Sequence, residues 1–189
     1  FRGRPIAFAR WDSYGANLPQ LQANAASAGH FNPLVDFDGE VRRIPMLVEH
    51  EGQYYEALSL AMVRTVLDMP TLLPGFAGEQ NKDYGGLEWL ALEGGLSIPV
   101  DAEVSALVPY RGKRGTFRYI PVADVLNGQV TLESLQNKIV LVGTSAPGLM
   151  DMRSTPVGEV YPGVEVHASM ISGILNQDLK QHPPYMLGA

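Results

Sequence analysis

The chain contains no cysteine, so disulfide bonds and thiolate metal sites are both excluded. No apolar run approaches the roughly 20 residues that a membrane-spanning helix needs. The histidines number four, at positions 30, 50, 167 and 182, and no two stand at metal-ligand spacing, which disfavours metal catalysis. Lys and Arg are scattered through a chain of net charge −6, and this argues against a nucleic-acid-binding surface.

What is present is the composition of a globular protein. The chain has 189 residues, 46% of them apolar, which is enough for one domain with a buried core. We find no signal peptide, and the sequence starts at Phe1 and not at Met, so we expect a fragment of a longer protein. We predict one domain over residues 1–180 and a linker over residues 181–189, where Pro183-Pro184 leads away from the core.

The last third of the chain carries the clearest structural pattern. The apolar run Lys138–Gly143 breaks into a Gly/Ser/Pro-rich loop, and a helix is expected from about Val164 to Leu175. This order predicts a β-loop-α unit of an α/β domain, with Lys138–Gly143 as a central, buried strand. The expected core residues are Ile139, Leu141, Leu58, Met62, Ile171 and Leu175.

Turn signals divide the rest of the chain. Asp38-Gly39, Glu51-Gly52 and Gly94-Gly95 each stand between two strand-like segments, which is typical of tight β-hairpins. Hairpins make antiparallel pairs, so we predict an α/β fold with a mixed β-sheet, flanked by helices, in a single domain.

The periodicity of apolar residues and the positions of Pro and Gly predict further strands and helices. Strands are expected at Pro5–Ala9 and Phe117–Ile120, and helices from Pro19 to about Ala28 and from about Glu56 to a point before Pro70. The stretch from Thr71 to Tyr84 holds two glycines and a proline and is interpreted as a long surface loop.

Asp36 and Asp38, followed by Gly39, resemble the start of a calcium-binding loop. An EF-hand requires Glu at the twelfth position, which is Leu47 here, so that interpretation fails. A turn in which Asp accepts backbone N–H groups is favoured.

Arg42 and Arg43 are neighbours in an expected strand, so their side chains should point to opposite faces. One guanidinium could bind a carboxylate or phosphate in a pocket. Pairing with Asp36 or Asp38 across the hairpin is the favoured alternative.

His167 shares a helical side with Met170, Ile171 and Ile174. A histidine on such an apolar side is usually a core residue with a hydrogen-bond partner, and Glu165 or a loop carbonyl could supply it.

The loop after Lys138–Gly143 matches neither a P-loop nor a dinucleotide-binding loop, and Ser145 is not in a G-x-S-x-G motif. A tight turn is favoured, with Asp151 capping the loop. A hydrolase built on Ser145, Asp151 and His167 is a further hypothesis, and it requires a hydrogen bond between Ser145 and His167.

Several ordered motifs together resemble the CHASE2 domain, over roughly residues 25 to 178. The resemblance is carried by Gly29–Asn32, Asp36–Gly39, Arg42–Pro45, Ser59–Ala61, Tyr110–Phe117, Ala123–Gly128, Lys138–Asp151, Thr155-Pro156 and Pro162–Ala168.

This resemblance implies a non-catalytic, extracytoplasmic sensor of a bacterial transmembrane signalling protein, outside the membrane and tethered to it by flanking helices. The output domain in such proteins is commonly an adenylate or diguanylate cyclase, a histidine kinase or a Ser/Thr kinase. We expect a homodimer, an unknown small-molecule or environmental signal, no cofactor, no metal and no nucleic acid. A ligandless dimerisation or scaffold module is the competing hypothesis. The candidate ligand-binding residues, by residue type and resemblance, are His30, Asn32, Asp36, Asp38, Arg42, Asp151 and His167.

Overall fold

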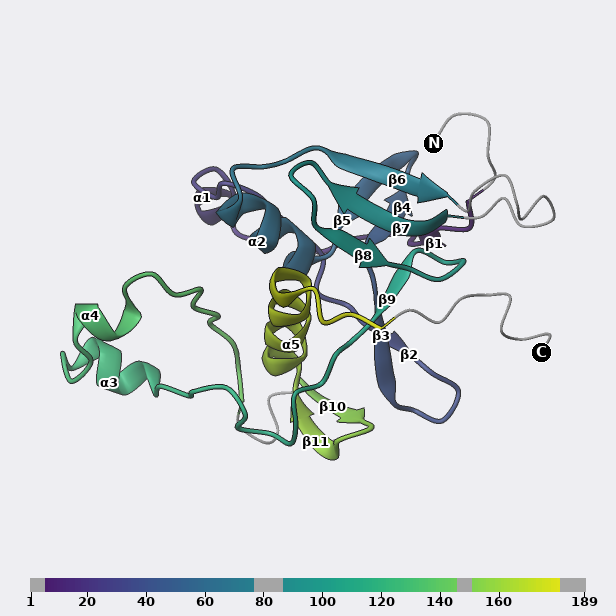
Figure 1. The fold of residues 1–189 in the computed structure, drawn as a ribbon. Helices are drawn as coiled ribbons and strands as arrows, with labels where there is room; N and C mark the ends of the chain where they lie inside the picture. The colour runs from purple at the N-terminus through teal and green to yellow at the C-terminus, as the bar shows by residue number, and fades with distance from the viewer. Residues whose placement is uncertain (1–5, 77–86, 146–150, 181–189) are drawn as a thin grey trace.

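The structure is a computed structural model, and it describes residues 6–76, 87–145 and 151–180. Within these ranges the strands form four small sheets, and two longer helices lie among them (Figure 1). The predicted mixed α/β fold is confirmed, although the strands are divided among small sheets and do not form one large sheet.

Two of the sheets come mainly from the first half of the chain. The sheet order β1-β4-β5 joins Ala9–Arg10, Leu47–His50 and Gln53–Glu56. It is mixed, because β1 runs parallel to β4 and β5 antiparallel to it. The sheet order β2-β3-β9 joins Leu34–Val35, Val41–Pro45 and Ser105–Leu107 through antiparallel pairs.

The other two sheets are wholly antiparallel. The order β6-β7-β8 joins Leu72–Phe76, Leu87–Leu92 and Ser97–Pro99. The hairpin β10-β11 joins Met152–Thr155 and Gly158–Pro162 and leads directly into the last helix.

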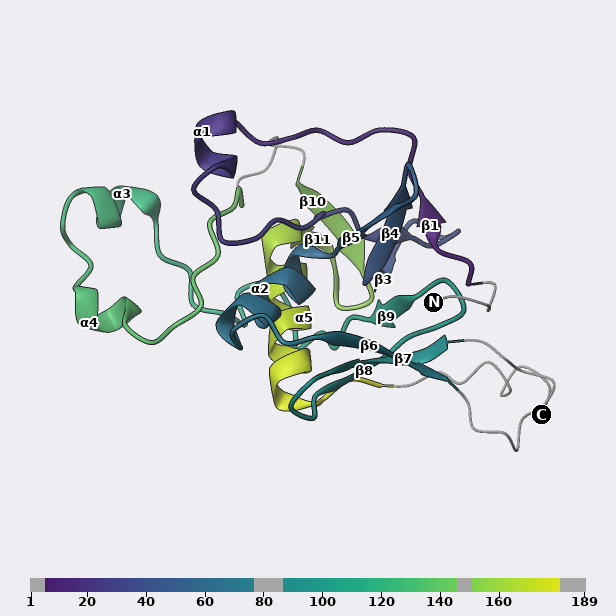
Figure 2. The same cartoon turned by 90° about the horizontal axis from the view of Figure 1, so that it is seen from above.

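Helices α2 (Leu58–Val66) and α5 (Gly163–Asn176) pack against each other. The short helices α1 (Pro19–Gln22), α3 (Val122–Leu126) and α4 (Leu132–Leu135) contain no buried residue. In both Figure 1 and Figure 2, α3 and α4 stand at the end of an arm that leaves the rest of the molecule.

The core lies where α2, α5 and the strands β3, β7, β8 and β9 bury their apolar side chains. Of the predicted core residues, Ile171 is fully buried, while Leu141, Met62 and Leu175 are partly buried and pack against the core. Leu58 is half-buried. The prediction for Ile139 is wrong, since its side chain is 36% exposed.

All three predicted hairpins are present. Gly39, Gly52 and Gly94 have φ angles of +84°, +76° and +106°, the region that glycine adopts without steric cost. Each glycine lies between strands that pair antiparallel, namely β2 with β3, β4 with β5 and β7 with β8. The helices predicted from about Glu56 and from about Val164 are also confirmed as α2 and α5.

The prediction of a central strand at Lys138–Gly143 is wrong. No strand is assigned there, and Val140 and Val142 are 52% and 91% exposed. A strand requires a neighbour to satisfy its backbone, and no described strand pairs with this segment.

Four other local predictions also fail. Within the predicted loop from Thr71 to Tyr84, the segment Leu72–Phe76 is the strand β6, and residues 77–84 lie outside the described residues. Pro74 fits because β6 lies at the edge of its described sheet, paired with β7. Helix α1 ends at Gln22 and does not reach Ala28, since Leu18 and Leu21 are exposed and no packing supports it. Phe117–Ile120 is not a strand, and β1 begins only at Ala9.

Gly75 supplies a stability test. It lies opposite Trp89 in the β6-β7 pair, and a Cβ atom there would lie 2.0 Å from the indole ring. We predict that Gly75→Ala lowers the free energy of unfolding by about 1–3 kcal/mol, because the ring must move out of its packing. The control Gly15→Ala, where a Cβ meets nothing within 4 Å, should change it by less than ~0.5 kcal/mol. Equal effects in urea unfolding would contradict this account.

Candidate functional site

A cavity of about 180 Å³ lies where three segments from distant parts of the sequence meet. The segments are the loop after His30 together with Leu58 at the start of α2, the end of the run Lys138–Gly143, and the N-terminus of α5 with Asp151 and Arg153 at the start of the β10-β11 hairpin. The lining is mostly apolar, with three polar side chains. The lining residues are Phe31, Pro33, Leu58, Leu141, Val142, Gly143, Asp151, Arg153, Gly163, Val164, Val166 and His167.

Asp151 and Arg153 supply the charged groups of the cavity. The Asp151 Oδ1 atom lies 3.6 Å from Arg153 Nη2, and the Asp151 carbonyl accepts a hydrogen bond of 2.9 Å from Gly163 N–H. A Cβ atom at Gly163 would lie 2.3 Å from Asp151 Oδ1, so only glycine permits this approach. The carboxylate therefore lies at the N-terminus of α5, where the helix dipole favours a negative charge. The loop that Asp151 is expected to cap includes residues 146–150, which lie outside the described residues.

His167 contributes the third polar side chain. It is 5% exposed, and its Nε2 lies 3.1 Å from the Phe31 carbonyl, so the interpretation of a core histidine bound to a loop carbonyl is confirmed. Since a carbonyl only accepts, Nε2 carries the proton, and in the neutral ring Nδ1 is an acceptor. Within the described part of the chain Nδ1 has no hydrogen-bond partner. Burial lowers the pKa of His167 and keeps the ring neutral.

His30 precedes the cavity residue Phe31 but is not itself in the lining. Its backbone N–H donates to Glu56 O and its carbonyl accepts from Leu58 N–H, which fixes the loop to the start of α2. Its ring stacks edge-on against Trp11, with centroids 4.8 Å apart. Burial lowers the pKa of His30 to about 4, with backbone interactions at Pro45 and Asn32 offsetting part of the effect.

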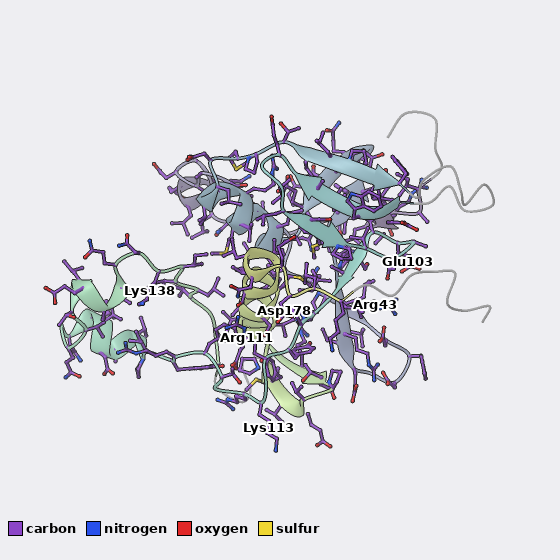
Figure 3. All side chains as sticks on the ribbon, in the orientation of Figure 1. Arg43, Glu103, Arg111, Lys113, Lys138 and Asp178 are labelled. Atoms are coloured by element: carbon purple, nitrogen blue, oxygen red, sulfur yellow. The ribbon has the colours of Figure 1, made fainter. Side chains whose placement is uncertain are left out.

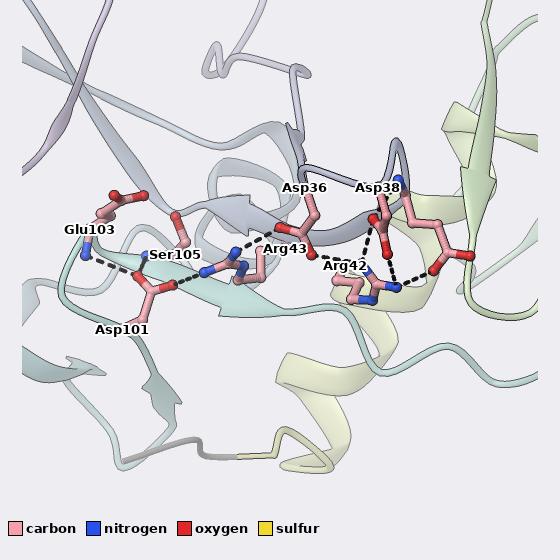
Figure 4. Close-up of polar contacts among 8 residues, drawn as sticks. Asp36, Asp38, Arg42, Arg43, Asp101, Glu103 and Ser105 are labelled. Carbon is pink, nitrogen blue, oxygen red and sulfur yellow. Dashed lines mark hydrogen bonds and ion pairs between the residues drawn. The ribbon is translucent and has the colours of Figure 1, made fainter. Parts of the chain in front are cut away.

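Asp36, Asp38 and Arg42 form a separate cluster on the β2-β3 hairpin (Figure 4). Arg42 pairs with Asp36 at 3.0 Å, with Asp38 at 2.7 Å and with Glu40 at 2.5 Å. Asp36 also accepts from Arg43 at 2.6 Å, so it bridges the two arginines. The predicted pairing of Arg42 across the hairpin is confirmed, and the turn interpretation of Asp36 to Gly39 is too, since Gly39 N–H donates to Asp36 O.

The arginines set the charge state of this cluster. Burial alone would raise the pKa of Asp36, but hydrogen bonds from Arg43 and Arg42 outweigh it and the pKa falls. The hydrogen bond from Arg42 lowers the pKa of Asp38 to about 2. A depression of about 270 Å³ beside the cluster is also lined by Asp101 and Lys180, but the carboxylates already occupy both guanidinium groups. The cluster is therefore a set of ion pairs within the β2-β3 hairpin, and Arg43 extends it to Asp101.

The seven candidate residues therefore do not form one site. Asp151 and His167 line the cavity, and Asn32 is exposed between two cavity residues, Phe31 and Pro33. His30 is outside the lining, and its backbone is bonded to Glu56 and to the cavity residue Leu58. The remaining three belong to the hairpin cluster.

The sequence suggests Glu165 only as a partner for His167, and its role beside the cavity is a different one. It is 2% exposed on α5, and its carboxylate accepts hydrogen bonds from Gly115 N–H, Phe117 N–H and the Tyr119 hydroxyl at 3.1, 3.3 and 2.6 Å. It thereby holds the 115–119 segment against α5, next to the cavity. The only sequence signal was a charged residue within an otherwise apolar helix pattern.

The chemistry of the cavity does not match the hydrolase hypothesis. His167 bonds to Phe31 and not to Ser145, while the Ser145 carbonyl accepts from Arg114. Across the described residues, no three His, Asp or Glu side chains are grouped to hold a metal ion. No helix in the described ranges has the length and apolarity to cross a bilayer.

The variant Glu165→Gln tests whether Glu165 holds residues 115–119 against α5. The amide NH₂ can accept no hydrogen bond and would face N–H donors, so we predict a loss of about 1–3 kcal/mol in unfolding free energy and faster proteolysis within residues 115–119. Glu159→Gln is the matched control, since Glu159 is exposed and its carboxylate forms no ion pair with the described residues. Equal stability of the two variants would disprove this role of Glu165.

The buried His30 ring predicts a pH dependence of stability. The unfolded chain binds a proton near pH 6.5 and the folded chain only near pH 4, so unfolding is favoured as the pH falls through this window. Stability should fall by about 2 kcal/mol between pH 7.5 and 5 from this group. The variant His30→Phe keeps an aromatic ring against Trp11. Denaturant titrations at several pH values should show that its free energy of unfolding depends less steeply on pH. A slope equal to that of the parent chain would refute the assignment.

The comparisons with known proteins bear on the whole chain. The profile of the CHASE2 domain matches residues 6–188. No curated protein and no solved structure matches the chain. CHASE2 domains are extracellular sensor domains of membrane signalling proteins. Because the match spans nearly the whole sequence, the chain belongs to the CHASE2 domain family, a family of sensor domains.

Proposed function

We propose that this chain is the extracytoplasmic, non-catalytic input domain of a bacterial transmembrane signalling receptor, and that it senses a small ligand in the cavity at the N-terminus of α5. The observation that carries the proposal is the position of the cavity between three segments that are distant in sequence. A ligand there contacts all three segments at once, so it favours one arrangement of them over others.

The lining defines the class of ligand. Most of the wall is apolar, while Arg153 can donate hydrogen bonds to a ligand and His167 Nδ1 and the Asp151 carboxylate can accept them. A small, mainly apolar molecule with one polar end fits this distribution better than a sugar or a nucleotide.

Helix α5 connects the cavity to the far end of the domain. Gly163 and Val164 line the cavity, and the same helix ends at Asn176, about 20 Å away at 1.5 Å per residue. Gln177 then turns the chain with a φ of +55°. A shift of α5 on ligand binding would therefore move the C-terminal end of the domain, from which we expect the chain to lead to the membrane.

The second candidate is a ligandless dimerisation module, in which packing alone sets the geometry of the parent protein. The exposed apolar side chains of the α3-α4 arm favour it, among them Val122, Leu126 and Leu132.

A thermal-shift screen with cavity variants separates the two candidates. We predict that an aliphatic or aromatic monocarboxylate, alcohol, amide or amine raises the melting temperature in a dose-dependent way, because it binds only the folded state. Val164→Trp, which fills the cavity, should abolish the shift. Val160→Trp, an exposed apolar position on β11 outside the cavity, should leave it unchanged.

Two outcomes contradict ligand sensing at this cavity. One is a screen without any shift, which favours the ligandless module. The other is a shift that persists in Val164→Trp, which places the ligand elsewhere.

A further inference from the structure

Two polar atoms of the cavity lining are buried without a hydrogen-bond partner among the described residues. They are Nδ1 of His167 and Nε of Arg153. Buried polar groups in folded proteins are nearly always hydrogen-bonded, so a buried atom without a partner calls for a specific explanation. Because both side chains line the cavity, these two atoms are the polar contacts that a ligand there can complete.

The two atoms have opposite hydrogen-bonding character. His167 Nε2 lies 3.1 Å from the Phe31 carbonyl and carries the ring proton, so Nδ1 of the neutral ring accepts a hydrogen bond. The side chain is 5% exposed, and its packing holds the ring in this orientation. Arg153 Nε always carries a hydrogen and can only donate. A ligand group that completes both contacts must therefore donate to the histidine and accept from the arginine.

The charges of the cavity lining already balance each other. Asp151 Oδ1 lies 3.6 Å from Arg153 Nη2, and the lining contains no other Asp, Glu, Lys or Arg. Burial has the largest effect on the pKa of His167, and the Asp151 carboxylate raises this pKa while the Arg153 guanidinium lowers it, so both charges act on the ring. Figure 3 shows Lys138 on the arm, on the opposite side of α5 from Arg43, and neither is in the lining. An ionised ligand group would find no free counter-charge in the lining.

We propose that the cavity binds the neutral polar end of a small molecule that both donates and accepts a hydrogen bond, as a primary carboxamide or an alcohol does. This inference rests on the proposed function and specifies the ligand of the same site. In a carboxamide the NH₂ group donates to His167 Nδ1, and the carbonyl oxygen accepts from Arg153 Nε. The cavity, at about 180 Å³, is smaller than the roughly 300 Å³ at the lower end of drug-sized pockets, so the apolar part of the ligand is short.

Other polar end groups complete only one of the two contacts. A carboxylate has no donor for His167 Nδ1, and it brings a second negative charge beside Asp151. An ammonium has no acceptor for Arg153 Nε, and it brings a second positive charge beside the guanidinium. A ketone accepts from the arginine but leaves the histidine unpaired. Each of these groups loses affinity, because a buried donor or acceptor stays without a partner in the complex.

Four molecules of nearly equal size test the proposal on the unaltered chain: butanamide, butanoate, butylamine and 2-pentanone. We expect NMR titrations near neutral pH to give butanamide a dissociation constant at least roughly tenfold lower than those of the other three. The ketone is the matched control, since it is neutral and carries CH₃ in place of the NH₂ group. Its weaker binding would separate the missing donor from any effect of ligand charge.

Two results of this titration overturn the proposal. If butanoate, butylamine or 2-pentanone binds as tightly as butanamide, the inferred ligand class is wrong, while ligand sensing at the cavity stands. If none of the four molecules binds, the inferred class is again wrong, and the thermal-shift screen decides separately whether the cavity takes any ligand.

Two variants assign the preference to the two atoms. In His167→Gln the amide nitrogen can still donate to the Phe31 carbonyl, but the amide oxygen lies one bond further from Cβ than Nδ1 does. This variant should weaken butanamide roughly tenfold and leave 2-pentanone unchanged. Arg153→Lys keeps the positive charge beside Asp151 and removes the Nε donor, so it should weaken both molecules.

The matched control is His50→Asn, at a histidine outside the lining whose Nδ1 lies 2.7 Å from the Trp11 carbonyl. Asn can keep that donor, so the preference for butanamide should not change. Circular dichroism melts report whether each variant folds. A folded His167→Gln that still prefers butanamide over 2-pentanone as strongly as the parent chain does overturns the role of Nδ1.

Discussion

Helix α5 can be buried on most of its surface only because its polar side chains find partners outside the helix. Glu165 accepts hydrogen bonds from the 115–119 segment, and His167 binds the Phe31 carbonyl. A buried carboxylate without these donors would cost several kcal/mol. The buried position of α5 therefore depends on residues 115–119 and on the loop after His30. The cavity is the space left where the loop after His30 and the end of the run Lys138–Gly143 meet the N-terminus of α5.

The end of the run Lys138–Gly143 forms one wall of the cavity. Leu141, Val142 and Gly143 all line it. Gly143 lets the segment approach α5, since a Cβ atom there would lie 2.6 Å from Val164 Cβ.

The candidate site was only partly accessible from sequence. The resemblance selected Asp151 and His167, which meet at the cavity, but it also selected Asp36, Asp38 and Arg42, which neutralise one another on a hairpin. Local spacing indicates that Asp and Arg are near each other, yet it does not show whether any charge is left over for a ligand. Arg153 and the apolar wall have no local signature at all, because they are defined by contacts between distant segments.

The sequence by itself determined the features whose physics is local. Gly39, Gly52 and Gly94 specify hairpins because positive φ favours glycine, and the apolar period after Val164 specifies α5. The tertiary structure alone decided the rest. Leu72–Phe76 is a strand because Leu87–Leu92 pairs with it and Gly75 makes room for Trp89. Lys138–Gly143 has the composition of a strand and is none in the described chain, because a strand exists only when another backbone satisfies its hydrogen bonds.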